Sequence, residues 1–371
     1  MDRQEALARR IAAQQLDRPV ADRPVTDAAV LDLGVQDTGR DAGSWALANR
    51  GVPVGSPAEL AASPDLALVW SLRGAPHWYR RADLPGVRDA TAPYDDADAR
   101  RRTLDAGRPL KAAGIGMLEG MGVVAATMHD VVREPTPKGV LSAELTARLP
   151  DPYLRDCRPC GARHVYEQPF RLAALGAGLE LEPGTSPPVL RRVAGWDRPP
   201  TMGDPERAPA HLRVVDAYAR LCGPTTPAAA ATFLDTPPGV VTRHWPEAAG
   251  EVDVDGDRAW VLPDLPPPAD VDGLVRLLGP FDLWLQARDR DVVVPDRSRH
   301  KALWPTIGRP GAVLVGTEVV GTWRPRASGR RLSVTVDAWE PLTPRVRDLV
   351  GAQAERLAAH RGVALTAVDL A

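Results

Sequence analysis

The sequence predicts an α+β protein built from tandem helix–helix–hairpin units and completed by a β-rich C-terminal part with a final helix. Three observations support this fold class: two helical segments precede a pair of apolar strands, the same order recurs twice, and long alternating runs follow. Helices followed by a strand pair are typical of winged helix-turn-helix units. The predicted divisions are 1–95, 96–200 and 201–268 for three such units, and 269–371 for the β-rich part.

The first unit begins with an amphipathic helix over residues 2–16. A second helix is expected over residues 43–49. Ser56 is placed to cap a third helix, and Pro57 takes the first turn of that helix. Alternating apolar residues over 66–70 then predict a strand, and a Gly-Ala-Pro turn leads into its partner.

The second unit repeats this order. The segment GVLSAELTARLP has leucines at helical spacing, with Ser142 placed as the cap. A second helix is expected over 165–175, and the segments LELEP and PVLRRVAGW are expected to pair as strands.

The third unit starts with a helix over 212–222, and Thr226-Pro227 begins the next helix. Two alternating runs then flank Asp255-Gly256, which predicts a hairpin with a type I′ turn. The units show no fixed sequence period, which excludes a solenoid.

The last part changes to an antiparallel strand meander, with turns at Gly316-Thr317 and near 327–329. Thr343-Pro344 caps a long final helix, which Gly362 ends.

Composition limits the function classes. Of the 371 residues, 44% are hydrophobic and 25% charged, which is typical of a globular protein. Lys+Arg 46 against Asp+Glu 48 gives a net charge of −2, which excludes a strongly basic, histone-like binder but not a local basic face. Three of the cations are lysines and 43 are arginines, whose planar guanidinium groups suit phosphates and base edges.

The cysteines and the apolar segments predict a cytoplasmic protein. Three cysteines are too few and too odd in number for a disulfide framework. The first residues are charged and lack the apolar core of a secretory signal. The longest apolar stretch, AAGIGMLEGMGVVAATM, is interrupted by Glu119 and four glycines, so no membrane span is predicted.

One cluster has metal-ligand spacing. Cys157-x-x-Cys160 with His164 offers three ligands, one fewer than a closed zinc site needs, and nothing around Cys222 supports it as a fourth. The alternative is a pair of small buried thiols at a helix corner. No metal is therefore assigned, and the absence of phosphate-loop and dinucleotide motifs predicts no cofactor.

Basic residues gather at two places. Arg73, His77, Arg80 and Arg81 surround the first predicted wing, where cations could meet phosphates. A second group includes Arg288 and Arg290, then Trp323 with Arg324, which offer charged forks and a flat face. The alternatives are a solvated or ion-paired charged surface and a core role for the tryptophans.

Ordered motifs along residues 31–363 carry a family resemblance. They are QDTGRDAGSWALANR, VWSLRGAPHW, LSAELTARLP with CRPCGARHVYEQPFRLAALGAGL, YARLCGPTTPAAAATFL, LLGPFDLWLQARDR and VLVGTEVVGTWR. In this order they resemble the winged helix DNA-binding domain-containing proteins that include the AlkZ/YcaQ-type DNA glycosylases. The resemblance implies tandem winged helices and a β-rich part, C-shaped around a channel for double-stranded DNA. It also implies removal of alkylated purines, including adducts at guanine N7.

The resemblance also implies catalytic residues. The family's Gln-x-Gln or Gln-x-Asp motif falls on Gly34-Val35-Gln36, where Gly34 leaves the first position without a side chain. Gln36 is expected to orient water, and Asp32 or Asp37 to supply a carboxylate. Alternation on an extended segment places Asp32 beside Gln36. The alternative for Gln36 is a backbone hydrogen bond at a helix start.

Two functions follow from the resemblance. The first is a monofunctional glycosylase that hydrolyses the N-glycosidic bond of alkylated bases. The second is a catalytically inactive DNA binder with a regulatory or sequestering role, and a protein-interaction scaffold is a third class. The expected DNA contacts are Arg40, Arg73, His77, Arg288, Arg290, Trp323 and Arg324. The sequence does not specify an oligomeric state.

Overall fold

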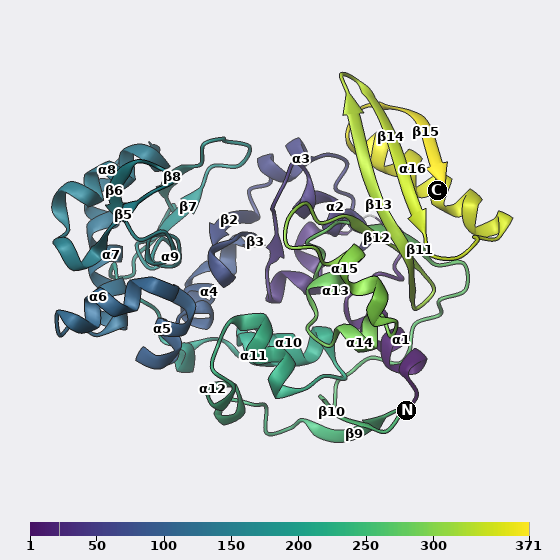
Figure 1. Cartoon of the computed structure of the whole chain (residues 1–371), viewed down its shortest axis with the longest axis horizontal. Coiled ribbons are helices and arrows are strands. Elements are labelled where there is room, and N and C mark those ends of the chain that lie inside the picture. Colours follow the sequence, from purple (N-terminus) through teal and green to yellow (C-terminus); the bar gives the residue numbers. More distant parts are fainter. Residues whose placement is uncertain (22, 371) are drawn as a thin grey trace.

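A six-stranded sheet organises the N-terminal half of the chain in the computed structural model, which describes residues 1–21 and 23–370 (Figure 1). Its strand order is β1-β3-β2-β7-β8-β4. The strands are β1 Val35–Gln36, β2 Leu66–Trp70, β3 Pro76–Arg80, β4 Thr136–Pro137, β7 Leu179–Leu181 and β8 Val189–Arg192. Leu68 of β2 pairs with Leu181 of β7, so the hairpins of the first two predicted units share one sheet across the 95/96 division.

The helices around the first hairpin include the three that the sequence predicts and a further one, α4, after the hairpin. They are α1 Arg3–Ala13, α2 Ala42–Ala48, α3 Pro57–Ala62 and α4 Leu84–Thr91. The Ser56 hydroxyl accepts a hydrogen bond from the Glu59 backbone N–H at the start of α3, which confirms the predicted cap. All five residues of β2 are buried, because both faces of this strand are covered.

The second region differs from the prediction at two helix starts. Its helices are α5 Asp96–Thr103, α6 Gly107–Ala112, α7 Met117–Val131, α8 Lys138–Arg148 and α9 Glu167–Leu172. Ser142 lies inside α8 rather than at its cap, because the bridge formed by β4 starts the helix at Lys138. Val165 belongs to a strand, since β5 Leu154–Cys157 and β6 Ala162–Val165 form a hairpin before α9.

The third region follows the prediction closely. Its elements are α10 Val214–Cys222, α11 Pro227–Leu234, α12 Pro238–Arg243, β9 Gly250–Val254 and β10 Asp257–Val261. The Thr226 hydroxyl caps α11 by accepting from the Ala229 N–H. Asp255 and Gly256 both have positive φ, 51° and 90°, as a type I′ turn requires.

The C-terminal sheet has the order β11-β12-β13-β14-β15. The strands are β11 Val275–Leu278, β12 Gly311–Val315, β13 Glu318–Ser328, β14 Arg331–Ala338 and β15 Ala364–Leu370, and the helices around them are α13 Leu283–Gln286, α14 Arg290–Val293, α15 His300–Leu303 and α16 Pro344–His360. Thr343 caps α16 as predicted. The expectation of a purely antiparallel part is wrong, because α16 is a crossover that returns β15 parallel to β14.

Two contacts join the N-terminal helices to this C-terminal part, one apolar and one a hydrogen bond. Leu7 and Ile11 of α1 share a buried cluster with Trp284 of α13. On the other side, the Trp45 indole of α2 donates to the Leu277 carbonyl of β11 at 2.6 Å. The residues just before α2 are thereby held close to those around α13.

Among the described residues, no single helix is both long and apolar enough to cross a membrane. One pair, Asp96–Ala112 with Met117–Val131, reaches that length and composition only across a 100° bend.

Candidate nucleic-acid interface

Gln36 lies on β1, which pairs with His77 and Trp78 of β3. Its side chain is 8% exposed and both ends of the amide are engaged. The Nε2 group donates to Thr38 Oγ1 at 2.9 Å, and Oε1 accepts from Arg73 Nη2 at 3.2 Å. The sequence alternative, a backbone hydrogen bond at a helix start, is not the arrangement found, because all these partners are side chains.

Arg73 connects three segments that are distant in the sequence. It lies in the turn between β2 and β3 with φ 58°. Its guanidinium donates to the Phe233 carbonyl at 2.8 Å, lies 4.5 Å from the Phe233 ring centre, and also contacts Gln286 Oε1. Burial and the nearby charge of Arg288 lower the pKa of Arg73 to about 10, so it stays charged at neutral pH.

Three further arginines lie near this network. Within residues 1–21 and 23–370, the guanidinium groups of Arg288, Arg290 and Arg309 have no carboxylate or carbonyl partner, and the Nε of Arg288 is buried without one. Arg290 lies 4.8 Å over the Trp304 ring and Arg309 lies 5.8 Å from the Phe281 ring centre. Burial, followed by the charge of Arg288, lowers the pKa of both. An anion would therefore relieve mutual repulsion here.

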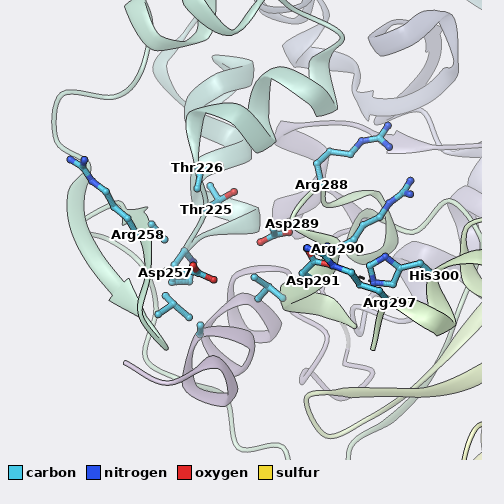
Figure 2. Close-up of a pocket in the computed structure, with 15 residues that line it drawn as sticks. Thr225, Thr226, Asp257, Arg258, Arg288, Asp289, Arg290, Asp291, Arg297 and His300 are labelled. Atoms are coloured by element: carbon cyan, nitrogen blue, oxygen red, sulfur yellow. Dashed lines mark hydrogen bonds and ion pairs between the residues drawn. The ribbon is translucent and has the colours of Figure 1, made fainter. Parts of the chain in front are cut away.

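Arg288 and Arg290 also line a cavity of about 650 Å³ between α1, the β9–β10 hairpin and the segment after α13. In Figure 2 both side chains extend in the same direction, away from Thr225 and Asp257. Asp289, between them in sequence, turns inward and pairs with the buried Arg10 at 2.5 Å. The Asp289 carboxylate is thus bound to Arg10, and Arg288 and Arg290 remain available to an anionic ligand.

A buried ion pair places Gln286 in this network. Arg50, just after α2, donates to both carboxylate oxygens of Asp282 at 2.8 Å, and both side chains are almost fully buried. Asp282 also caps α13 by accepting from the Trp284 N–H at 3.0 Å. Because Gln286 ends this one-turn helix, the pair fixes it relative to α2 and β1.

Gly34 cannot be replaced by a larger residue without strain. Its φ is +85°, and a Cβ atom there would lie 2.3 Å from Tyr79 Cζ. The Tyr79 hydroxyl donates to the Leu33 carbonyl at 3.1 Å, which holds the ring in this position. The Tyr79 ring therefore fills the space that a side chain at the first position of the family motif would occupy.

The two carboxylate candidates lie in different surroundings. Asp32 accepts from Arg80 at 2.6 Å and Arg220 at 2.9 Å. It lies in a 3-10 turn over Ala29–Asp32, so the extended alternation expected to place it beside Gln36 does not exist. Asp37 accepts from the Gly43 N–H at 2.9 Å, and burial raises its pKa.

His77 and Trp323 are corrections to the expected DNA contacts. His77 is 2% exposed, and burial lowers its pKa to about 3. Trp323 is 3% exposed and donates to the Leu278 carbonyl at 2.8 Å inside the C-terminal sheet. Both side chains are buried, so neither is exposed to a ligand at the surface.

The remaining predicted cations divide into exposed and paired groups. Arg40 is exposed beside a cavity that Asp37 also lines, and Arg324 is exposed on β13 with a bond to the Gly308 carbonyl. Arg80 pairs with Asp32, and Arg81 pairs with Glu180 at 2.9 Å. At these two residues the first predicted wing therefore carries ion pairs, and is neither a free DNA-binding surface nor the solvated charged surface of the alternative.

Three residues of the network were not expected from the sequence. Thr38 lies two residues after Gln36, so strand alternation could have identified it. No sequence pattern near Gln286 or Arg309 indicates a role in the site. The buried Arg50–Asp282 pair positions Gln286, and the Phe281 ring positions Arg309.

Comparison with known proteins first defines the class of fold. The structure of the Streptomyces sahachiroi DNA glycosylase AlkZ matches with a TM-score of 0.72 at 20% sequence identity, and the match covers 100% of each chain. At this identity the match shows the fold, a mixed α/β arrangement with several antiparallel sheets. No curated protein matches the chain.

The family follows from a second finding. The family model described as DNA glycosylase AlkZ-like matches residues 30–360, which include β1, the Arg73 turn and the arginines after α13. The chain therefore belongs to the AlkZ-like DNA glycosylase family, which confirms the resemblance seen in its motifs.

Proposed function

We propose that this protein binds double-stranded DNA and excises alkylated purines, with adducts at guanine N7 as the substrate class. The observation that carries the proposal is the position of Gln36, held by Arg73 at 3.2 Å in a network beside Arg288, Arg290 and Arg309. Under this proposal the helix–hairpin groups act as winged helices in a C-shaped arrangement, and the arginines bind phosphates of the duplex.

Hydrolysis of an N7-alkylated guanosine needs few catalytic groups. An N7-alkylated guanine is positively charged and leaves readily, so the enzyme needs to orient a water and stabilise an oxocarbenium-like sugar. The Gln36 amide suits the first task, since its Oε1 can accept from a water as it now accepts from Arg73.

The shape of the site favours a bulky adduct. A cavity of about 10 Å³ between Gln36, Gly34, Phe281 and Gln286 is too small for a base. An adduct that is hydrolysed without drawing the base into the protein would not need an enclosed pocket.

Tyr79 supports the second candidate, a catalytically inactive DNA binder. Its ring fills the space that a side chain at position 34 would need, so the first group of the motif is absent. Such a protein would keep the arginines and the duplex affinity but release no base.

An excision assay separates the two candidates. The substrates are duplexes that contain N7-methylguanine or a bulkier N7 adduct, and the glycosylase proposal expects base release that falls about 100-fold in Gln36→Ala. Gln4→Ala, an exposed glutamine on α1, is the matched control and keeps full activity. Salt-sensitive DNA binding without release would select the inactive binder, and absence of both would overturn DNA binding itself.

A further inference from the structure

A compact group of metal-ligand side chains lies far along the chain from the Gln36 network. Cys157, Cys160 and His164 place one ligand atom each within 4.8 Å of one another. They occupy the hairpin of β5 and β6, where the Gly161 N–H donates to the Arg158 carbonyl at 3.3 Å and Gly161 has φ 61°. This tight turn contains Cys160 and returns the chain toward β6, so the two thiols lie close together.

The histidine ring is already oriented as a ligand. Its Nδ1 lies 2.7 Å from the Val165 backbone carbonyl. A carbonyl oxygen only accepts, so Nδ1 carries the proton and Nε2 keeps its lone pair for a metal. Histidine ligands in metal sites commonly have such a second partner, which fixes both the tautomer and the ring direction.

Apolar burial contributes little to holding the shape of the hairpin. β5 and β6 form a separate two-stranded sheet, and Val165 is the one buried residue of its eight. A two-stranded hairpin is marginally stable in water by itself. A cross-link through Cys157, Cys160 and His164 would supply what apolar burial does not.

We propose that Cys157, Cys160 and His164 bind one Zn²⁺ ion, with water at the fourth position. Two thiolates and one imidazole are a donor set that favours zinc. Among the described residues no fourth protein ligand joins the group, and Glu167 is held by Lys138 and Arg171 at 2.6 Å each. Cys222 is fully buried in α10, outside the group.

Metal analysis of the full chain tests the site. Protein loaded with Zn²⁺ in reducing buffer and then desalted should retain about one zinc per chain. Cys157→Ser and Cys160→Ser should each weaken zinc affinity by more than the about 100-fold that loss of an outer partner can cost. Cys222→Ala is the matched control and retains the zinc. Stoichiometric zinc in both serine variants, or no retained zinc in the wild type, would overturn the proposal.

A second measurement reports on the hairpin without depending on activity. Trypsin cleavage after Arg155, just before the site, and after Arg163, within it, should be slow with zinc bound and become faster after a zinc chelator is added. The Cys157→Ser variant should be cleaved at the faster rate with or without chelator. Equal cleavage rates of the wild-type protein with and without zinc would contradict the role of the ion in holding β5 and β6.

Discussion

Gly34 and Tyr79 decide which polar groups the β1 segment presents. Gly34 has a positive φ, and a Cβ atom added to it would lie 2.3 Å from Tyr79 Cζ. The first position of the motif therefore has no side chain of its own. The Gln36 amide bonds instead to Thr38, two residues along the chain, and to Arg73. Gln36 is therefore paired with Thr38, whereas the family motif implies a glutamine–glutamine or a glutamine–aspartate pair.

Restoring the family side chain should fail for steric reasons. Gly34→Gln is expected to lower the free energy of unfolding by about 2–5 kcal/mol, from the positive φ and the collision with Tyr79. Gly114→Gln is the control, because Gly114 has φ +75° with open space around it and should lose only about 1–2 kcal/mol. Urea unfolding checks both; equal losses would mean that Tyr79 moves aside.

His77 should make stability depend on pH. Its folded pKa of about 3 lies below the unfolded value of about 6.5, so protons favour the unfolded chain. The contribution of neutral His77 to the free energy of unfolding is complete above about pH 6.5. It is lost at about 1.4 kcal/mol per pH unit as the pH falls toward 3. His77→Gln should flatten the fall in unfolding free energy between pH 6 and pH 4. A slope unaltered in His77→Gln would remove this residue as the cause.

At the scale of elements, the Arg50–Asp282 pair is the connection that matters most for the site. It joins the end of α2 to the cap of α13, and the Trp45–Leu277 bond holds α2 against β11 nearby. Gln36 and Gln286 come from segments separated by 250 residues. Their common contact with Arg73 depends on these connections between elements.

Breaking the buried pair should cost far more than breaking an exposed one. Asp282→Asn leaves the Arg50 charge buried without its partner and should lower the free energy of unfolding by about 3–5 kcal/mol. Arg148→Ala removes an exposed pair with Glu144 and should cost less than about 1 kcal/mol. Denaturant midpoints measure both, and similar costs would show that solvent reaches the Arg50 site.

At the scale of the whole molecule, ion pairing explains how a chain of net charge −2 keeps a basic region. Many arginines, such as Arg80 and Arg102, are bound to carboxylates. Arg288, Arg290 and Arg309 have no such partner in the described part of the chain. The net charge therefore says little about the local field, which these three residues set.

The salt dependence of duplex binding should reveal these arginines. Removing Arg288, Arg290 and Arg309 together should reduce the slope of log K against log salt by about 2.7, which is about 0.9 per phosphate contact. A control with the same charge change removes three exposed, ion-paired arginines, Arg148, Arg207 and Arg345. Fluorescence anisotropy over a salt series measures both slopes. An equal change in the two variants would show that total charge, rather than this cluster, governs binding.

The local structure of this protein was largely predictable. Ser56, Thr226 and Thr343 each cap the helix expected of them, because a cap needs only neighbouring backbone groups. The type I′ turn at Asp255-Gly256 formed for the same reason. Ser142 failed as a cap because the pairing of β4 with β8, which is not local, starts α8 earlier.

The sequence by itself determined the family, the capped helices and the identity of Gln36 and Arg288 as candidate residues. Tertiary structure decided which of the candidates meet. It buried His77 and Trp323, paired Asp32 with two arginines, and brought Gln286 to Arg73. The physical reason is range: caps and turns depend on bonds within a few residues, whereas burial and ion pairing depend on segments that only the complete fold brings together.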